Sequence, residues 1–110
     1  MFGLFKSLTK NDAFENLDAQ EFLAKLRTNP DAVLLDVRTP SEVAAGKIKG
    51  AVNLDFFDPA FASKVGRMDK QKPYFIYCRS GQRSANACRT MHEMGFSKLY
   101  NMAGGIIAMG

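Results

Sequence analysis

The most reactive side chain of this sequence, the thiol of Cys78, stands at the start of a short glycine-containing loop. Arg79 and Arg83 carry positive charge on this loop, and Gly81 between them permits a sharp bend of the backbone. Successive N–H groups in such a loop can point at one spot and form an anion-binding nest, and the following helix start adds partial positive charge. Because these features favour a thiolate, we predict that the pKa of Cys78 lies below the ordinary cysteine value of ~8.5.

The spacing of the loop predicts the size of the group that it holds. Four residues separate Cys78 from Arg83, whereas the loop of cysteine phosphatases is one residue longer and surrounds a tetrahedral oxyanion. The shorter loop closes around a smaller group, such as a single anionic sulfur atom. The predicted binding set consists of Arg79, Ser80, Gly81, Gln82 and Arg83.

The remaining cysteine and histidine each have a structural and a chemical interpretation. Cys88 falls on the inward stripe of a predicted helix, so a buried structural role is favoured over that of a resolving thiol. His92 is expected on a solvated helix face. Two cysteines and one histidine are too few for a Cys/His metal site, so we expect no metal and no cofactor.

Charged residues upstream of the loop also have two interpretations. Asp36, Arg38 and Glu42 could form an acid–base set, but an ion-pair network that braces the loop is favoured, because an ionised Cys78 needs no proton transfer. Three aromatic residues could line a pocket for a partner, although core packing is the favoured interpretation. These are Phe56, Phe57 and Phe61.

Strands that alternate with helices must position these residues. Short apolar or aromatic runs predict strands at 32–36, 51–54, 74–77 and 99–102. A capping box of Asp18 and Glu21 starts the first predicted helix. The later predicted helices begin at Thr39 with Pro40, at 58–59, and at Ser84, the last ending near Met94, and 104–105 opens a final turn. This alternation predicts an α/β sandwich around a mainly parallel sheet.

Length and composition restrict the classes of function. The chain has 110 residues, 46% of them hydrophobic and 24% charged, which fits one globular domain. Its net charge of +4 is spread along the chain, so we expect a small anionic substrate and no nucleic acid. No stretch approaches the ~20 apolar residues of a membrane span, so no stable membrane association is expected. Free thiols favour a reducing, cytoplasmic setting. Residues 1–13 are predicted to be a loosely held lead-in, followed by a single domain over 14–110.

Four segments in order resemble the rhodanese family of sulfurtransferases, in the size range of its single-domain bacterial members. They are residues 35–42 (LDVRTPSE), residues 46–53 (GKIKGAVN), residues 78–84 (CRSGQRS), and residues 95–96 with 104–106 (GF and GGI). Two positions depart from the family pattern: Lys47 replaces a histidine that we treat as structural, and Met109 stands near the end where tryptophan is usual.

The resemblance implies a three-layer sandwich with helices on both faces of the sheet, and a thiosulfate sulfurtransferase activity. Cys78 would take the outer sulfur of thiosulfate as a persulfide and pass it to cyanide, to a thiol or to a dithiol protein of the thioredoxin type. The backbone of 79–83 would hold the persulfide, and Arg79 and Arg83 would orient the donor unless Arg83 pairs with an acid. The main alternative is a sulfur carrier loaded by a protein persulfide donor, with little thiosulfate activity. A redox pair with Cys88 and a phosphatase are less favoured, and a binding-only module least of all.

Overall fold

Five parallel strands form a single sheet in the spatial order β1-β5-β4-β2-β3. The computed structural model describes residues 13–109. The strands are β1 (Glu15–Leu17), β2 (Val33–Asp36), β3 (Val52–Asn53), β4 (Tyr74–Tyr77) and β5 (Leu99–Met102). β4 lies at the centre of the sheet, between β5 and β2, and its carboxyl end leads directly into the Cys78 loop.

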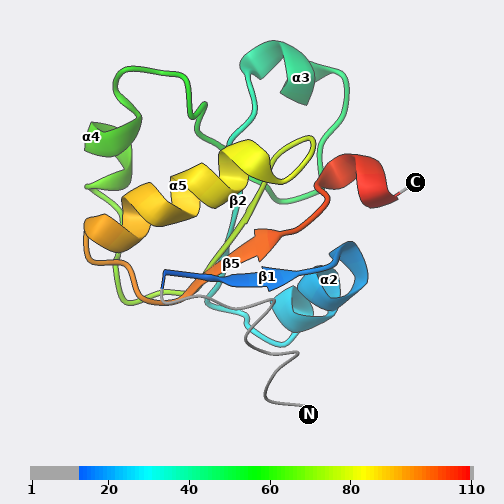
Figure 1. Cartoon of the computed structure of the whole chain (residues 1–110), viewed down its shortest axis with the longest axis horizontal. Helices are drawn as coiled ribbons and strands as arrows, with labels where there is room; N and C mark the ends of the chain where they lie inside the picture. The colour runs from blue at the N-terminus through cyan, green and yellow to red at the C-terminus, as the bar shows by residue number, and fades with distance from the viewer. Residues whose placement is uncertain (1–12, 110) are drawn as a thin grey trace.

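Helices cover both faces of this sheet, as the sandwich prediction requires (Figure 1). They are α2 (Ala19–Arg27), α3 (Pro40–Ala44), α4 (Phe61–Val65), α5 (Gln82–Glu93) and a closing 3₁₀ helix, η1 (Ile106–Met109). α5 packs on β4 and β5 from one face, where it also contacts α4, while α2 and η1 pack together on the other face. The predicted three-layer α/β architecture is therefore confirmed. None of the helices within residues 13–109 combines the length and apolar character that crossing a membrane requires.

The central strand owes its position to an uninterrupted run of apolar and aromatic residues. Tyr74 and Ile76 point into the cluster beneath α5, while Phe75 and Tyr77 point into the cluster beneath α2, and all four are buried. Side chains alternate across a strand, so only a strand covered on both faces buries every member of such a run. By the same alternation Cys78 continues the α5 face, where it belongs to the core cluster.

Helix starts follow the predicted capping pattern in two places. The Asp18 side chain accepts a hydrogen bond from the Glu21 N–H at 2.8 Å, which caps α2. α3 has the full capping box: Thr39 accepts from the Glu42 N–H, and the Glu42 carboxylate accepts from the Thr39 N–H. Because this box fixes the first turn of α3, it also fixes the direction of the Glu42 side chain.

One strand was not predicted, and two helices begin at other residues than predicted. β1 was missed because three residues carry no readable alternation, and their strand conformation depends on pairing with β5. α4 begins at Phe61 instead of 58–59, because the Asp58 side chain accepts from the Ala60 N–H and forms a separate turn first. α5 begins at Gln82 instead of Ser84. The predicted lead-in, residues 1–13, lies outside the described residues except for Ala13, so its flexibility and the domain limits of 14–110 stay predictions.

The C-terminal turn supports the Cys78 loop from below. The Ile106 N–H donates to the Cys78 carbonyl at 2.9 Å, and the Ile107 N–H donates to the Arg79 carbonyl at 3.2 Å. Gly105 makes this close approach possible: its φ is +69°, and a Cβ there would overlap the backbone of Arg79 and Ser80. The glycine is therefore required by both backbone conformation and space.

Replacing Gly105 with Ala should lower the free energy of unfolding by about 3 kcal/mol, because the added Cβ both strains the backbone and displaces the loop. Gly50→Ala is the matched control, since Gly50 has φ of +88° but nothing within 4 Å of the added Cβ. Urea unfolding should show that the control costs only about 1 kcal/mol of backbone strain. Equal losses in the two variants would show that the close contact under the loop contributes nothing.

Candidate functional site

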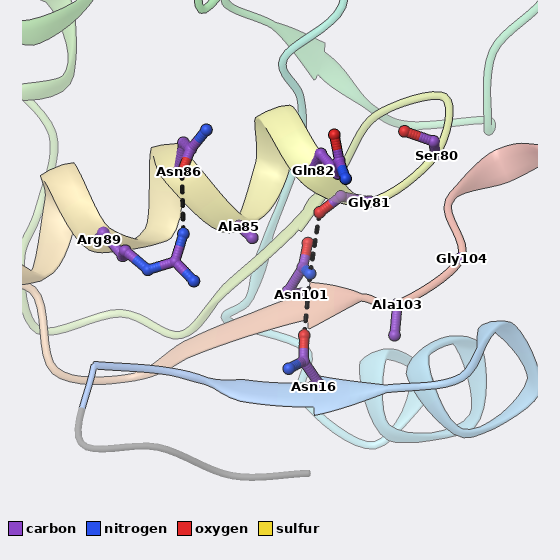
Figure 2. A pocket seen from close by; sticks show the side chains of 10 residues that line it. All are labelled: Asn16, Ser80, Gly81, Gln82, Ala85, Asn86, Arg89, Asn101, Ala103 and Gly104. Atoms are coloured by element: carbon purple, nitrogen blue, oxygen red, sulfur yellow. Dashed lines mark hydrogen bonds between the residues drawn. The ribbon is translucent and has the colours of Figure 1, made fainter. Parts of the chain in front are cut away.

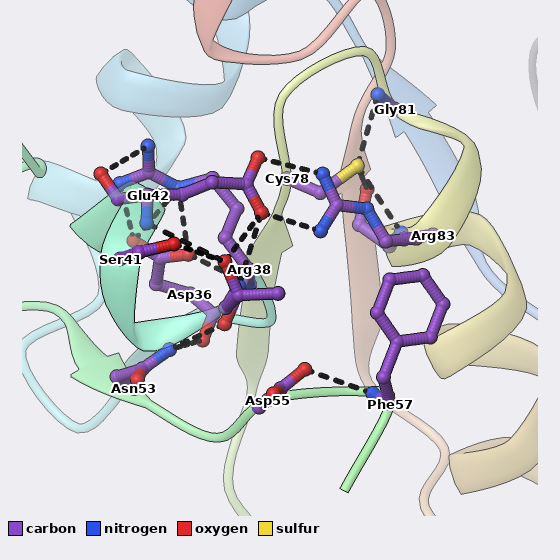
Figure 3. A network of polar contacts seen from close by, with 12 residues as sticks. Asp36, Arg38, Ser41, Glu42, Asn53, Asp55, Phe57, Cys78, Gly81 and Arg83 are labelled. Atoms are coloured by element: carbon purple, nitrogen blue, oxygen red, sulfur yellow. Dashed lines mark hydrogen bonds and ion pairs between the residues drawn. The ribbon is translucent and has the colours of Figure 1, made fainter. Parts of the chain in front are cut away.

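The Cys78 thiol lies at the centre of a tight turn at the carboxyl end of β4. Its Sγ accepts a hydrogen bond from the Gly81 N–H at 3.1 Å (Figure 3). It also accepts from the Ser84 N–H and from the Ser84 hydroxyl, both at 3.4 Å. Gly81 is the N-cap of α5 and has φ of +98°, a conformation that other residues rarely adopt. This left-handed residue lets the chain enter α5 at once and turns the N–H groups toward the sulfur.

Burial and hydrogen bonding act on the thiol in opposite directions. Cys78 is fully buried, and burial alone raises the pKa of the thiol. The hydrogen bonds from the Ser84 hydroxyl and from the backbone N–H groups of Ser84, Gly81 and Ser80 lower it, and together they outweigh burial. The pKa of Cys78 therefore lies below its ordinary value. A buried sulfur that receives several donors and has a depressed pKa is suited to carry negative charge.

Arg83 forms an ion pair with an acid on α3. Its guanidinium donates to both carboxylate oxygens of Glu42, at 2.7 and 2.9 Å (Figure 3). Of the two roles that the sequence left open for Arg83, the structure therefore shows the ion pair. This pair lowers the pKa of Glu42 to about 2 and ties α3 to the first turn of α5. Arg79 is exposed, and no carboxylate within residues 13–109 forms a salt bridge with it.

A second ion pair, between Arg38 and Asp36, is buried. Arg38 donates to Asp36 through Nε and Nη2, the closest contact being 2.7 Å, and Nη2 also reaches the Gly46 carbonyl. The Tyr77 hydroxyl donates to the same carboxylate at 2.7 Å, and burial is the main cause that raises the pKa of Tyr77 to about 12. Asp36 and Arg38 thus join β2 to β4 and to the turn after α3. Neither side chain hydrogen-bonds to the Cys78 sulfur.

A polar groove borders the loop on the side of β1 and α5 (Figure 2). It encloses about 580 Å³ and is lined by Asn16, Ser80, Gly81, Gln82, Ala85, Asn86, Arg89, Asn101, Ala103 and Gly104. Most of these side chains are uncharged hydrogen-bonding groups. Cys78 is absent from this lining, so the groove lies beside the thiol site and is separated from it by the Ser80–Gly81 turn.

The predicted site residues fall into three groups in the structure. Cys78 and the Gly81 backbone meet at the sulfur, Arg83 turns to Glu42, and the exposed Arg79, Ser80 and Gln82 side chains form the rim. Ser84 was missed as a site residue, although it closes the motif 78–84, because it was assigned only to the helix. The structure places its hydroxyl and N–H on the sulfur.

Residues outside the loop agree with their structural interpretations except for Phe57. Cys88 is fully buried, and burial raises the pKa of its thiol well above the ordinary value, which disfavours a resolving role. His92 is exposed. The prediction that Phe57 packs in the core is wrong: it is 64% exposed and lies against the Arg83 guanidinium, 5.4 Å from ring centre to Cζ. Lys47, at the departure from the family pattern, is exposed and donates to the Ala51 carbonyl.

Comparison with known proteins shows the family to which this domain belongs. Residues 18–109 match the model of the rhodanese-like domain. The chain belongs to the rhodanese-like family. Its similarity to individual proteins supports the same assignment. The chain is 35% identical over 92 residues to a sulfurtransferase of Allochromatium vinosum, covering 84% of each chain. It is 33% identical over 92 residues to thiosulfate sulfurtransferase GlpE of Pseudomonas putida, covering 84% of this chain and 81% of that protein.

Solved structures support the same family at the level of the fold. The rhodanese-like domain protein of Staphylococcus aureus superposes with a TM-score of 0.75 at 27% identity. The match covers 86% of this chain and 90% of that protein. This chain is thus a single rhodanese-like domain from the sulfurtransferase family, and the loop after its β4 begins with Cys78.

Replacing Glu42 with Gln should lower the free energy of unfolding at pH 7 by about 1–2 kcal/mol, because it removes the charge of the pair with Arg83 but keeps a capping oxygen. The pKa of Glu42 is about 2 in the folded rhodanese-like domain and ordinarily 4.5. Its contribution is therefore complete above pH 4.5 and is lost as the pH falls toward 2. Urea unfolding at pH 7 and pH 3 should show a smaller difference between the two proteins at pH 3. A difference independent of pH would mean that the ion pair is not its source.

Replacing Ser84 with Ala should raise the pKa of Cys78 by up to about one unit, because the sulfur loses one of the hydrogen bonds that favour its charged form. The measurement is the rate of alkylation by iodoacetamide as a function of pH. Ser80→Ala is the control, since Ser80 contributes a backbone N–H that the substitution keeps. If both variants titrate like the unmodified protein, the Ser84 hydroxyl does not stabilise the thiolate.

Proposed function

We propose that this rhodanese-like domain is a thiosulfate sulfurtransferase that moves a sulfane sulfur from a small anionic donor to a thiol through a persulfide on Cys78. The observation that carries the proposal is the set of donors around Sγ, from the Gly81 N–H and the N–H and hydroxyl of Ser84. Such a set stabilises a thiolate before the reaction and a negative sulfur group after it. The similarity to GlpE, which is named a thiosulfate sulfurtransferase, supports thiosulfate as the donor.

In the first step the Cys78 thiolate attacks the outer sulfur of thiosulfate. The new bond joins Sγ to that sulfur, the sulfur–sulfur bond of thiosulfate breaks, and sulfite leaves with the bonding electron pair. The three negative charges of thiolate plus thiosulfate become those of the persulfide anion plus sulfite, so no proton has to move. A general base is therefore unnecessary, in agreement with the depressed pKa of Cys78.

In the second step an acceptor thiolate attacks the outer sulfur of the persulfide. The Sγ–S bond breaks, its electron pair returns to Cys78 as thiolate, and the acceptor leaves as a persulfide. Cyanide, which leaves as thiocyanate, can replace the thiolate in an assay. The cellular acceptor in this proposal is a thiol or dithiol protein of the thioredoxin type. The proposed location is the cytoplasm, where such thiols and both free cysteines of this chain stay reduced.

Access to the sulfur depends on the rim of the loop. Since Cys78 has no exposed surface, a donor reaches it only when groups around the loop move. Arg79 is the rim residue suited to attract thiosulfate, because its charge is not offset by a salt bridge with any carboxylate in the described part of the chain. The charge of Arg83 is already balanced by Glu42.

The second candidate is a carrier that a protein persulfide donor loads at the same cysteine. The exposed Phe57 favours it, because a large aromatic ring beside the loop offers contact area that a small anion does not use. The chemistry at Cys78 is unchanged in this case, since sulfur arrives on a thiol in place of sulfite. Thiosulfate would then load the protein poorly.

The test is the intact mass of the reduced protein after incubation with thiosulfate, before and after addition of cyanide. We expect a gain of one sulfur that cyanide reverses with release of thiocyanate. One sulfur weighs almost the same as two oxygens, so the cyanide step separates a persulfide from over-oxidised cysteine. Cys78→Ser should abolish the gain, and the matched Cys88→Ser variant should keep it. No gain with thiosulfate, but loading from a persulfide-bearing protein, would establish the carrier instead.

A further inference from the structure

Asn101 is a buried polar residue at a position where the sheet otherwise buries apolar side chains. It lies in β5, pairs in register with Ile76 of β4 and is only 2% exposed. Ile76 and Cys78 belong to the core cluster beneath α5, and Asn101 lines the groove on that side of the sheet. An amide in such a place has to be hydrogen-bonded to offset its loss of water.

The Asn101 amide is only partly satisfied. Its Nδ2 donates to the Gly81 carbonyl at 3.2 Å and to the Asn16 Oδ1 at 2.9 Å (Figure 2). Its Oδ1 is buried and finds no hydrogen-bond partner in the described part of the chain. An unsatisfied buried acceptor costs about 1–3 kcal/mol, so this side chain is a poor choice for stability alone.

The Gly81 carbonyl does not need Asn101 in order to be satisfied. It already accepts the Ala85 N–H at 3.1 Å, as the first hydrogen bond of α5. The bond from Asn101 therefore adds a constraint on where Gly81 lies. That constraint matters because the N–H of the same residue donates to the Cys78 sulfur at 3.1 Å.

We propose that Asn101 is a positioning residue that holds Gly81, so that its N–H stays directed at the Cys78 sulfur. Gly81 has φ of +98° and, as a glycine, could leave this conformation easily. The hydrogen bond from Asn101 holds the carbonyl of Gly81. The hydrogen bond to the Cys78 sulfur holds the N–H of the same residue. Asn16 accepts from the same Nδ2 and orients the Asn101 amide. A less ordered Gly81 donates less well to the charged sulfur, which weakens the thiolate.

The proposal deepens the function proposed for Cys78, and its test requires no sulfur donor. Alkylation by iodoacetamide as a function of pH reports the pKa of Cys78 alone. If thiosulfate transfer fails but alkylation responds to Asn101, the function is wrong and the positioning role stands. If thiosulfate transfer succeeds but replacing Asn101 leaves the pH dependence of alkylation unchanged, the proposed function stands and the positioning role is wrong.

The decisive variant is Asn101→Leu, which keeps the branching and the number of heavy atoms of the side chain and removes its polar atoms. We expect the pKa of Cys78 to rise by up to about one unit, with alkylation near pH 6.5 slowed up to about tenfold. The midpoint of thermal unfolding should stay unchanged or rise, since the unsatisfied Oδ1 is removed and the Gly81 carbonyl keeps Ala85. A purely structural residue would give the reverse pattern of lost stability with an unchanged pKa.

Two further variants complete the experiment. Asn16→Ala removes only the group that orients Asn101 and should shift the pKa of Cys78 in the same direction by a smaller amount, in case Asn101→Leu fails to fold. Asn53→Leu is the matched control, because the Asn53 Nδ2 likewise donates two hydrogen bonds, here to the backbone carbonyls of Asp36 and Arg38 outside the loop. This control should lower the midpoint of thermal unfolding and leave the pKa of Cys78 unchanged. An unchanged pKa in folded Asn101→Leu or, failing that variant, in Asn16→Ala overturns the proposal, as does an equal shift in Asn53→Leu.

Discussion

The convergence of N–H and O–H donors on one sulfur atom is the constraint on which the site depends. A fully buried thiol is costly to ionise, and only donors that are already in place when the charge appears can offset that cost. At Cys78 these donors come from consecutive backbone positions and from Ser84, and they are brought together by the left-handed conformation of Gly81. A glycine supplies this geometry but does not hold it. The supports around the loop therefore matter as much as the loop itself.

Most of the charged side chains around the site are already neutralised by an ion pair with another side chain. Arg83 is paired with Glu42 and Arg38 with Asp36, so neither guanidinium is an unpaired cation. The negative sulfur is stabilised chiefly by neutral dipoles in direct contact with it. Dipoles at contact distance are little affected by salt, whereas a rim cation such as Arg79 acts on a donor at longer range and is screened. The two tasks of stabilising the sulfur and attracting an anion are thus divided between different groups.

Much of the fold follows from patterns within single segments, and much of the site does not. The run Tyr74–Tyr77 predicts a central strand because only such a strand buries every residue. β1 has no such pattern, since its three residues become a strand only through pairing with β5. Phe57 looked like a core residue by type, but a turn places it outside against Arg83. No pattern in the sequence indicates a role for Asn101, which is a single polar residue in a strand. Its role depends on a hydrogen bond to Gly81, twenty positions away.

The strand order explains why the loop can be supported from two sides. In a parallel sheet all carboxyl ends meet at one edge, and β4 lies between β2 and β5. The chain after β2 forms α3 and brings Glu42 to Arg83, while the chain after β5 forms η1 and brings Ile106 to the Cys78 carbonyl. A loop after an edge strand would have a neighbour on one side only. Cys78 therefore follows the one strand of this sheet with two strands on either side of it, and the motif 78–84 acquires its geometry from segments far away in the sequence.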